Sequence, residues 1–380
     1  MARSLIFLSV GDDSGDLHAS NLMREIRALE PQVGFAGLGL GRMVEAGLEP
    51  LEAADRRGGA MGMHNVLRML EHRRRCELCG DFFRQRRPDL VLLVDYGGFN
   101  LYLARMATLA GIPVLYYILP QVWAHGRYRL KKIRKWVTRP VVIYPFEPAL
   151  YRRYGVEAQY VGHPLFDELE RTPLNEAAVE GLRSQFGDGL IALFPGSRPQ
   201  EVKANLPIML RAAGRISRAL PSARFASVCP EKVRPLVDRM LRGGEVEVTL
   251  PEVRPVELAR AARLCITKSG TITLEIAGQL KPMVILYRLN ALTCFFACGI
   301  GQSPYMGLVN TLAGRMICPE KVLWKDEWRW VAKKALELLG DAQSYENCRR
   351  DLESVMRDFA RPGASRRAAR IAVEMIRGGG

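Results

Sequence analysis

Short apolar runs separated by longer helix-like segments form the main hydrophobic pattern of this chain. In the first half the runs are Leu5 to Val10, Leu90 to Asp95, Val114 to Leu119 and Val141 to Tyr144. Apolar runs this short, without alternating polar residues, are typical of strands that are covered on both faces of a parallel sheet. Their alternation with helical patterns therefore predicts an α/β fold.

The second half repeats this pattern. Its runs are Leu190 to Phe194, Arg224 to Cys229, Val246 to Leu250, Leu264 to Thr267 and Met283 to Tyr287. Residues 167–189 are charged and contain no such run, which predicts a linker. A chain of 380 residues also exceeds the length of one ordinary domain. We therefore expect domains at residues 1–168 and 169–345, followed by C-terminal helices at 346–380 that pack back across the domains.

Glycine-containing loops follow the first apolar run of each half. The first is Gly11-Asp12-Asp13-Ser14-Gly15-Asp16, and the second is Phe194-Pro195-Gly196-Ser197-Arg198. Open parallel sheets bind ligands beyond the carboxyl ends of their strands, so we expect these loops to face one cleft. The three acids of the first loop would repel a bare phosphate and favour a hydroxyl-rich partner. Helix capping by Ser14 or Asp13 is the alternative interpretation.

The second loop has the chemistry of a diphosphate clamp. Gly196 and Ser197 leave backbone donors accessible, and Arg198 offers a planar fork for phosphate oxygens. Further along, Ser269, Gly270 and Thr271 follow a buried run and open a helix, where N–H groups favour an anion. Glu275, one turn later, is placed to bind the two hydroxyls of a ribose. A capping box of Thr271 and Glu275 is the alternative.

Asp95 ends a buried run and is followed by Tyr96-Gly97-Gly98-Phe99-Asn100. A carboxylate at a ligand-facing strand end suits a general base. Capping of the helix that starts at Asn100 explains the same residue equally well.

The net charge of +15 favours anionic partners, namely nucleic acid, lipid or a phosphorylated substrate. Residues 126–139 form a basic amphipathic helix that suits either a lipid surface or an ordinary solvated face. Met61 to Leu70 is a methionine-rich amphipathic stretch that suits acyl chains or core packing.

Other sequence features exclude several classes of protein. The eight cysteines are scattered, and Cys76 and Cys79 lack the second pair of a zinc site, so we expect reduced thiols and no metal. The first apolar run is too short for a secretory signal. Between Arg288 and Arg315 no residue is charged, but polar residues, proline and glycines interrupt the stretch, which argues against a membrane-spanning helix.

Taken in order, these motifs resemble those of the lipid A disaccharide synthase family of inverting glycosyltransferases. The matching positions are Gly11 to Asp16, Asp95 with Phe99 and Asn100, Pro120 to Ala124, Pro145 to Glu147, Tyr160 to Pro164, Pro195 to Arg198, Ser269 to Thr271 with Glu275, and Asn310 with Leu312 to Arg315. Each match is short, but their order and separations are specific. The resemblance implies the GT-B type of α/β fold, two Rossmann-like domains whose parallel sheets face a central cleft.

The resemblance also implies a reaction. An acylated glucosamine is transferred from UDP to the 6-hydroxyl of an acylated glucosamine 1-phosphate, with inversion and without a metal or cofactor. Asp95 is then the base that deprotonates the acceptor hydroxyl. The residues that it assigns to the UDP-sugar are Gly196, Ser197, Arg198, Ser269, Gly270, Thr271, Glu275 and Asn310, and those that position the sugars are Ser14, Gly15, Asp16, Asn100 and Trp123.

The expected partners follow from this reaction. We expect the acylated donor and acceptor as substrates and no binding of nucleic acid. We also expect contact with an anionic lipid surface at the inner face of the cytoplasmic membrane, with residues 60–70 as an apolar segment that receives acyl chains. A homodimer is compatible with the sequence. The chain departs from the family at Asp12, where Glu is usual, and at Tyr96-Gly97-Gly98, where proline is common. The alternatives are another GT-B sugar-nucleotide enzyme such as a UDP-sugar epimerase, a lipid-binding paralogue without chemistry, and a basic nucleic-acid-binding protein.

Overall fold

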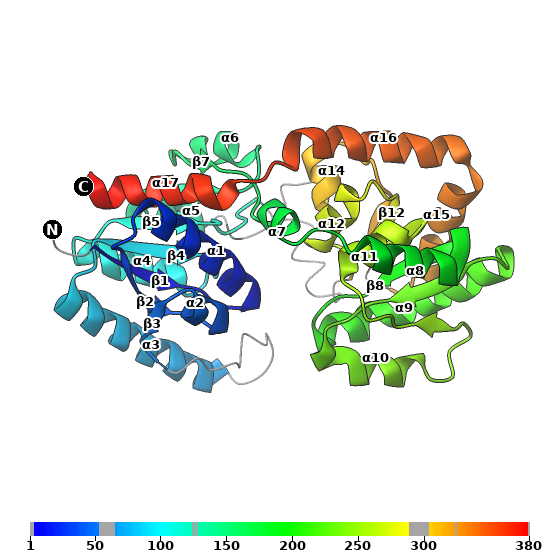
Figure 1. Ribbon diagram of the computed structural model, residues 1–380, viewed down its shortest axis with the longest axis horizontal. Coiled ribbons are helices and arrows are strands. Elements are labelled where there is room, and N and C mark those ends of the chain that lie inside the picture. Colours follow the sequence, from blue (N-terminus) through cyan, green and yellow to red (C-terminus); the bar gives the residue numbers. More distant parts are fainter. Residues whose placement is uncertain are drawn as a thin grey trace. The chain divides into compact units, whose positions relative to one another are not determined.

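The chain divides into two compact units (Figure 1). The computed structural model describes residues 4–52, 65–123, 126, 128–288, 304–323 and 325–378. The first unit comprises residues 1–171 and 361–380, and the second comprises residues 172–360. The C-terminal helices are divided between them, because α16 (Ala342–Phe359) belongs to the second unit and α17 (Ala364–Arg377) to the first.

The first unit is built on a seven-stranded sheet in the order β3-β2-β1-β4-β5-β6-β7. Every neighbouring pair in it is parallel. Its strands are β1 (Leu5–Ser9), β2 (Gly34–Leu38), β3 (Leu48–Pro50), β4 (Leu90–Val94), β5 (Val114–Tyr117), β6 (Arg139–Val142) and β7 (Gln159–Tyr160).

Helices cover both faces of this sheet. Its helices are α1 (Asp13–Leu29), α2 (Gly41–Glu45), α3 (Asn65–Arg86), α4 (Asn100–Leu109), α5 (Arg129–Trp136), α6 (Glu147–Arg152), α7 (Leu165–Arg171) and α17. The last helix lies along α1 and also contacts β4, whereas α4 contacts α3, α5 and β4 (Figure 1). Asp167 accepts hydrogen bonds from the backbone N–H groups of Gly363, Ala364 and Ser365 and so holds the start of α17.

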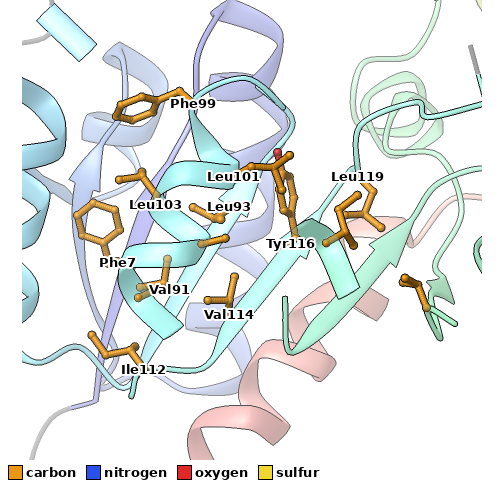
Figure 2. Close-up of a cluster of buried hydrophobic side chains, with 14 of the residues drawn as sticks. Phe7, Val91, Leu93, Phe99, Leu101, Leu103, Ile112, Val114, Tyr116 and Leu119 are labelled. Atoms are coloured by element: carbon orange, nitrogen blue, oxygen red, sulfur yellow. The ribbon is translucent and has the colours of Figure 1, made fainter. Parts of the chain in front are cut away.

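An apolar cluster between α4 and the sheet supports the carboxyl ends of the central strands. Phe7 of β1 and Leu93 of β4 pack there with Leu103 of α4 and Tyr116 of β5 (Figure 2). These side chains are fully buried, and burial contributes about 1.5 to 3 kcal/mol for each large apolar side chain. The cluster therefore makes this part of the sheet a rigid base for the loops that follow β1 and β4.

The second unit has a six-stranded sheet in the order β10-β9-β8-β11-β12-β13, again with every neighbouring pair parallel. Its strands are β8 (Leu190–Phe194), β9 (Arg224–Ser227), β10 (Val248–Thr249), β11 (Leu264–Lys268), β12 (Met283–Arg288) and β13 (Glu320–Leu323). Its helices are α8 (Glu176–Phe186), α9 (Pro199–Ala219), α10 (Arg234–Leu241), α11 (Pro255–Ala261), α12 (Ile272–Gly278), α14 (Leu308–Ala313), α15 (Trp328–Gly340) and α16.

Both strand orders reverse at one point, between β1 and β4 in the first sheet and between β8 and β11 in the second. At such a switch point the connecting helices leave on opposite faces of the sheet, which opens a crevice beyond the carboxyl ends of the two strands. The predicted fold of two Rossmann-like parallel-sheet units is confirmed. The four loops at the switch points are those that follow Ser9, Val94, Phe194 and Lys268.

The pattern of apolar runs missed four strands, β2, β3, β7 and β13. These strands are glycine-rich, only two or three residues long, or charged at a sheet edge, so they lack a continuous apolar run. The first unit gives way to the second after Arg171, within the predicted linker at residues 167–189, but this segment is not an irregular connection. Most of it is helical, and α8 packs on α11 through an apolar side that includes the buried Val179 and Leu182.

Some predictions concern residues outside the described part of the chain. They are the landing strip at residues 60–64, Ala124 of the tryptophan motif, and residues 289–303 of the uncharged stretch. Within the described ranges, no helix is both long enough and apolar enough to span a membrane.

Candidate functional site

Asp95 directly follows β4 in an unusual backbone conformation. The φ angles of Asp95 and Tyr96 are +47° and +52°, a left-handed region that few residues other than glycine adopt. Such a conformation costs about 1 to 3 kcal/mol per residue and persists only where surrounding contacts enforce it. The backbone N–H of Asp95 donates to Tyr117 (3.1 Å), and its carbonyl accepts from the hydroxyl of Tyr116 (2.7 Å). The loop is therefore held from β5.

Asn100 ties the ends of β1 and β4 together. Its side chain is fully buried, and its Nδ2 donates to the carbonyl of Asp95 at 2.9 Å and to those of Val94 and Ser9 at 3.2 and 3.3 Å. Its Oδ1 accepts from the hydroxyl of Ser9 at 2.8 Å. All of these bonds are internal, so Asn100 positions Asp95. The N-cap residue of α4 is Phe99, so the alternative that Asp95 caps this helix is not observed.

The loops after β1 and β4 also meet through Gly11 and Tyr96. A β-carbon on Gly11 would lie only 2.1 to 2.6 Å from three atoms of the Tyr96 ring. The hydroxyl of Tyr96 lies 3.2 Å from Nε2 of His72 in α3. Glycine is thus required at position 11 for the ring to lie across the first loop, beside the backbone of Asp95.

We expect Gly11→Ala to destabilise the first unit by about 1 to 3 kcal/mol, because the added carbon must displace Tyr96 or the strained loop. Urea unfolding at equilibrium measures this change. Gly98→Ala is the matched control, since a β-carbon there has no atom within 4 Å. The double variant Gly11→Ala/Tyr96→Ala should be less impaired than Gly11→Ala alone. If Gly11→Ala and Gly98→Ala lowered the free energy of unfolding equally, the close contact between Gly11 and the ring of Tyr96 would be contradicted.

The first loop begins helix α1, and its cap is Asp12, not Ser14 or Asp13. Asp12 has extended backbone angles, and its Oδ1 accepts from the backbone N–H of Gly15 (2.9 Å) and from the hydroxyl of Ser14 (2.8 Å). Ser14 remains exposed while Gly15 is buried beneath it. The loop therefore presents the hydroxyl of Ser14 outward while Asp12 fixes its orientation.

Asp16 makes its hydrogen bonds within the protein, and its predicted part in positioning the sugars stays a prediction. Only 3% of Asp16 is exposed, and its carboxylate accepts backbone N–H groups from Leu40 (2.8 Å), Arg42 (3.0 Å) and Met43 (3.3 Å). These bonds hold the loop after β2 and the start of α2 against the first turn of α1. Asp16 is thus a positioning residue, since its oxygens are occupied within the protein.

Trp123 is likewise held by internal contacts. Its ring is nearly buried between Tyr144 and Phe146, and its Nε1 donates to Oε1 of Glu147 at 3.1 Å. The second carboxylate oxygen of Glu147 accepts the N–H groups of Ile143 and Tyr144. Burial raises the pKa of Glu147 to about 7 despite these bonds. Glu147 lies within a motif of the sequence but was not predicted as a site residue.

In the second unit, Glu201 organises the loop after β8. Its carboxylate accepts the N–H of Ser197 at 3.1 Å and Nζ of Lys268 at 3.0 Å, and it lies 3.8 Å from Nη1 of Arg198. Lys268 ends β11, so this cluster joins the two strand ends at the switch point. Burial opposes ionisation, but Lys268, Ser197 and Arg198 together hold the pKa of Glu201 below its usual value.

Gly196 allows Glu201 to approach this closely. Its φ is +125°, and a β-carbon there would lie 2.5 Å from Oε2 of Glu201. The 21-residue helix α9 begins immediately after Arg198 and has no side-chain cap. Its N-terminus therefore adds a partial positive charge beside two cations. Sequence reasoning missed Glu201 and Lys268; a signal was available for Glu201, because an acidic residue is favoured in the first turn of a helix.

The loop after β11 differs in detail from its prediction. The N–H of Ser269 is used within the sheet by the carbonyl of Leu286 (2.8 Å), and its hydroxyl donates to the carbonyl of Met306 (2.6 Å). The predicted alternative of a capping box is not observed, because Thr271 makes no side-chain capping bond. Gly270, with φ +155°, and the exposed Thr271 are left as the outward part of the loop.

Glu275 lies one turn beyond this loop in a largely buried position. Burial raises its pKa to about 7, and the positive charge of Arg254 only partly opposes the shift. A carboxyl group with this pKa is partly protonated at neutral pH, so a ligand that donates hydrogen bonds to it would favour its ionised form.

Asn310 is completely buried, and its amide is saturated by internal bonds. Its Oδ1 accepts the N–H groups of Ile317 and Cys318, and its Nδ2 donates to the carbonyl of Cys318 and to Oε2 of Glu320. Glu320 in turn accepts the N–H groups of Met306 and Gly307. Asn310 therefore shapes the segment that contacts Ser269, and its predicted part in nucleotide binding stays a prediction.

The polar residues at each switch point suit different ligands. The first unit presents Asp95 and Ser14, a carboxylate and a hydroxyl, whereas the second presents Arg198 and Lys268 beside a helix N-terminus. No group of three or more potential metal-binding side chains occurs within the described residues. Two Rossmann-like units, each with polar loops at the switch point of a parallel sheet, define the class of GT-B proteins.

Sequence comparison identifies the family within this class. A family model described as lipid-A-disaccharide synthetase matches residues 6–375. Lipid-A-disaccharide synthases of Trichlorobacter lovleyi and of an Anaeromyxobacter species are 34% and 38% identical, in each case over 98% of this chain and 97% of theirs. The enzyme of that name from Coxiella burnetii is 31% identical over 99% of this chain and all of its own. The chain belongs to the lipid-A-disaccharide synthase family of glycosyltransferases.

Solved structures with the same fold are distant in sequence. A Staphylococcus aureus protein determined with UDP superposes with a TM-score of 0.67 at 13% identity and covers 98% of this chain and 97% of that one. The Neisseria meningitidis UDP-GlcNAc 2-epimerase gives 0.58 at 14% identity, covering 98% of this chain and 99% of that chain. At such identities the likeness concerns the fold alone.

Proposed function

We propose that this protein condenses UDP-2,3-diacylglucosamine with 2,3-diacylglucosamine 1-phosphate, forming the β-1,6-linked disaccharide 1-phosphate and UDP. The observation that carries this proposal is Asp95, held in a strained conformation at the switch point of the first sheet by Asn100 and Tyr116. Strain maintained in this way is typical of functional residues. The family supports the substrate pair and distinguishes a transferase from the epimerases that share the fold.

Asp95 is the general base of this proposal. Its carboxylate takes the proton of the acceptor 6-hydroxyl as that oxygen attacks C1 of the donor sugar. The bond between C1 and the phosphate oxygen breaks at the same time, so UDP leaves with the electron pair and the configuration at C1 inverts. Ser14 and Gly15 position the sugars from the neighbouring loop, and Asn100, Asp16 and Trp123 support that surface from within.

The second unit holds the nucleotide in this proposal. Gly196, Ser197 and Arg198, with Lys268 and the start of α9, bind the diphosphate and stabilise the charge that develops on the leaving group. Glu201 keeps the two cations in place. Gly270 and Thr271 border the nucleotide, Glu275 binds the ribose hydroxyls, and Ser269 and Asn310 hold the loop that carries them. The reaction requires no metal or cofactor.

The substrates set the location of the reaction. Both are acylated and lie in a bilayer, so we propose that the protein works at the inner face of the cytoplasmic membrane as a peripheral protein. The net charge of +15 supports attraction to such a surface.

The proposal is tested by incubating the purified protein with the two acylated substrates in detergent and measuring UDP release together with the mass of the disaccharide. Both products are expected in equal amounts. Release of UDP without disaccharide would indicate hydrolysis, and conversion of a non-acylated UDP-sugar to its epimer would support an epimerase. If neither product forms while UDP still raises the melting temperature, the nucleotide site stands but the acceptor is wrong.

The pKa of Glu275 predicts how nucleotide-sugar binding depends on pH. Between pH 6 and 8 the ionised fraction of a group with a pKa of about 7 rises from about one tenth to nine tenths, so affinity should increase up to about ninefold. UDP-N-acetylglucosamine is a suitable probe in calorimetry because its diphosphate does not titrate in this range. Glu275→Gln should bind more weakly and with little dependence on pH, whereas an unchanged pH profile in this variant would exclude Glu275 as the titrating group.

The raised pKa of Glu275 predicts that the stability of the folded protein decreases with rising pH, whereas nucleotide-sugar affinity increases. Because the pKa is raised from 4.5 to about 7 on folding, the folded protein binds the proton more tightly than the unfolded chain. The contribution of Glu275 to stability is therefore present below pH 4.5 and lost as pH rises towards 7.

A further inference from the structure

The outer surface of α4 and α5 in the first unit combines aromatic side chains with cations. On α4, Tyr102 and Leu109 are 56% and 69% exposed, and Arg105 lies on the same side of the helix. Neither helix contains an acidic residue. We call this surface the α4–α5 face; its residues are Tyr102, Arg105, Leu109, Tyr128, Lys131, Lys132, Lys135 and Trp136.

The apolar side of α5 is not part of this face. Leu130 and Ile133 are buried in the core cluster of the unit, so the helix cannot turn these residues towards a bilayer without unfolding. The exposed side of α5 carries Lys131, Lys132 and Lys135. The apolar side of α5 is therefore not exposed to a lipid surface, and what this helix presents outward is a cationic surface.

The cations of the α4–α5 face lie against its aromatic rings. Lys132 Nζ is 5.4 Å from the ring centre of Tyr102 and 5.9 Å from that of Tyr128, and Lys135 Nζ is 4.5 Å from Trp136. The guanidinium of Arg105 is 6.0 Å from the same tryptophan. Among the described residues no carboxylate forms an ion pair with Arg105, Lys131, Lys132 or Lys135. Their charges are thus available to an external anion.

We propose that the α4–α5 face binds the surface of an anionic lipid bilayer. Tyrosine and tryptophan side chains have apolar rings and polar ends and are enriched at the level of lipid headgroups. Lysine and arginine beside them attract anionic phosphates, and each contributes about a fivefold gain in binding to an anionic leaflet. A surface with four such cations, two exposed tyrosine rings beside the half-buried Trp136, and an exposed leucine has the composition of an interfacial contact.

The α4–α5 face lies close to the loop that carries Asp95. α4 begins at Asn100, directly after the Asp95 loop, and Arg129 at the start of α5 lies close to Gly97 within that loop. Contact with a bilayer through these helices would therefore bring the lipid surface to the unit that carries Asp95. This consequence rests on the proposed function, whereas binding to lipid does not.

The binding experiment uses flotation of the full-length protein with vesicles of phosphatidylcholine alone or with 30% phosphatidylglycerol. We expect binding only to the anionic vesicles and a steep decrease with salt. Lys132→Gln/Lys135→Gln should weaken binding about 25-fold. Tyr102→Ser/Tyr128→Ser retains the net charge and should also weaken binding, which tests the aromatic contribution separately.

The matched control is Arg215→Gln/Arg242→Gln, which removes two exposed cations from the second unit. An equal loss in this control would show that net charge alone causes binding and would overturn the proposal, as would failure of the unaltered protein to bind. Preferential binding of transfer RNA, lost in the lysine variant, would assign the face to nucleic acid instead. Thermal unfolding checks that each variant is folded.

Turnover measurements distinguish the proposed lipid binding by the α4–α5 face from the proposed transferase function. The lysine variant should keep its turnover on substrates dispersed in detergent and lose it on substrates in anionic vesicles. If the unaltered protein has no transferase activity but binds anionic vesicles through this face, the lipid site stands and the proposed function fails.

Discussion

Asp95→Asn should lower the turnover of the transferase by about 10² to 10⁴, because a positioned general base contributes about that factor. The substitution is nearly isosteric, and asparagine is among the residues that tolerate a positive φ, so the loop should keep its conformation. The hydrogen bonds of the backbone at position 95 to Tyr117, Tyr116 and Asn100 are retained. UDP affinity should therefore remain unchanged while kcat falls, as measured by UDP release and by calorimetry.

Asp13→Asn is the matched control for this experiment. Asp13 is an exposed acid in the loop after β1, so its substitution removes the same charge without removing the proposed base. We expect turnover within about twofold of the unaltered protein, since exposed substitutions have small effects. Retention of full turnover by Asp95→Asn, or an equal loss in both variants, would show that Asp95 is not the base.

Asn310→Ala should destabilise the second unit by about 3 to 5 kcal/mol. The substitution leaves the buried N–H groups of Ile317 and Cys318 and the carbonyl of Cys318 without their partner, and each buried group left in this state costs about 1 to 3 kcal/mol. It also releases Glu320, which holds Met306 and Gly307 next to Ser269. Urea unfolding followed by circular dichroism measures the loss of stability.

Asn347→Ala provides the comparison, because Asn347 is an exposed amide on α16 whose bonds are made at the surface. Its loss should cost within about 0.5 kcal/mol. Nucleotide binding adds a second readout: where Asn310→Ala remains folded, UDP should raise its melting temperature less than it raises that of Asn347→Ala. Equal stability of the two variants would contradict the structural role of Asn310.

Asn310 shows why the sequence predicts the positions of the loops more easily than the role of each residue within them. The motifs marked loops that do follow buried strands, since glycines and polar residues after apolar runs are typical of the carboxyl ends of such strands. They did not separate residues that face outward from residues that hold the loop. Asp16, Asn100 and Asn310 have the composition of ligand-binding residues, but their polar atoms are used by backbone groups from elsewhere in the chain.

Glu201 and Lys268 show the reverse case, in which residues at the switch point were not predicted from the sequence. Neither was predicted, yet their ion pair joins the ends of β8 and β11 at the switch point. Their partnership spans 67 residues and depends on the order of strands in the sheet, which local patterns do not encode. The contact between Gly11 and Tyr96 has the same origin, because β1 and β4 become neighbours only when the sheet forms.

The sequence by itself determined the two α/β units, nine of the strands, the loops at the switch points and the family, because buried parallel strands require continuous apolar runs and glycine loops require particular residues. Only the tertiary structure decided which polar residues are exposed, which are used in holding the loops after β4, β8 and β11, and that the apolar side of α5 is buried. Burial and hydrogen bonding depend on neighbours that are distant in sequence, so these roles exist only once the sheets are assembled.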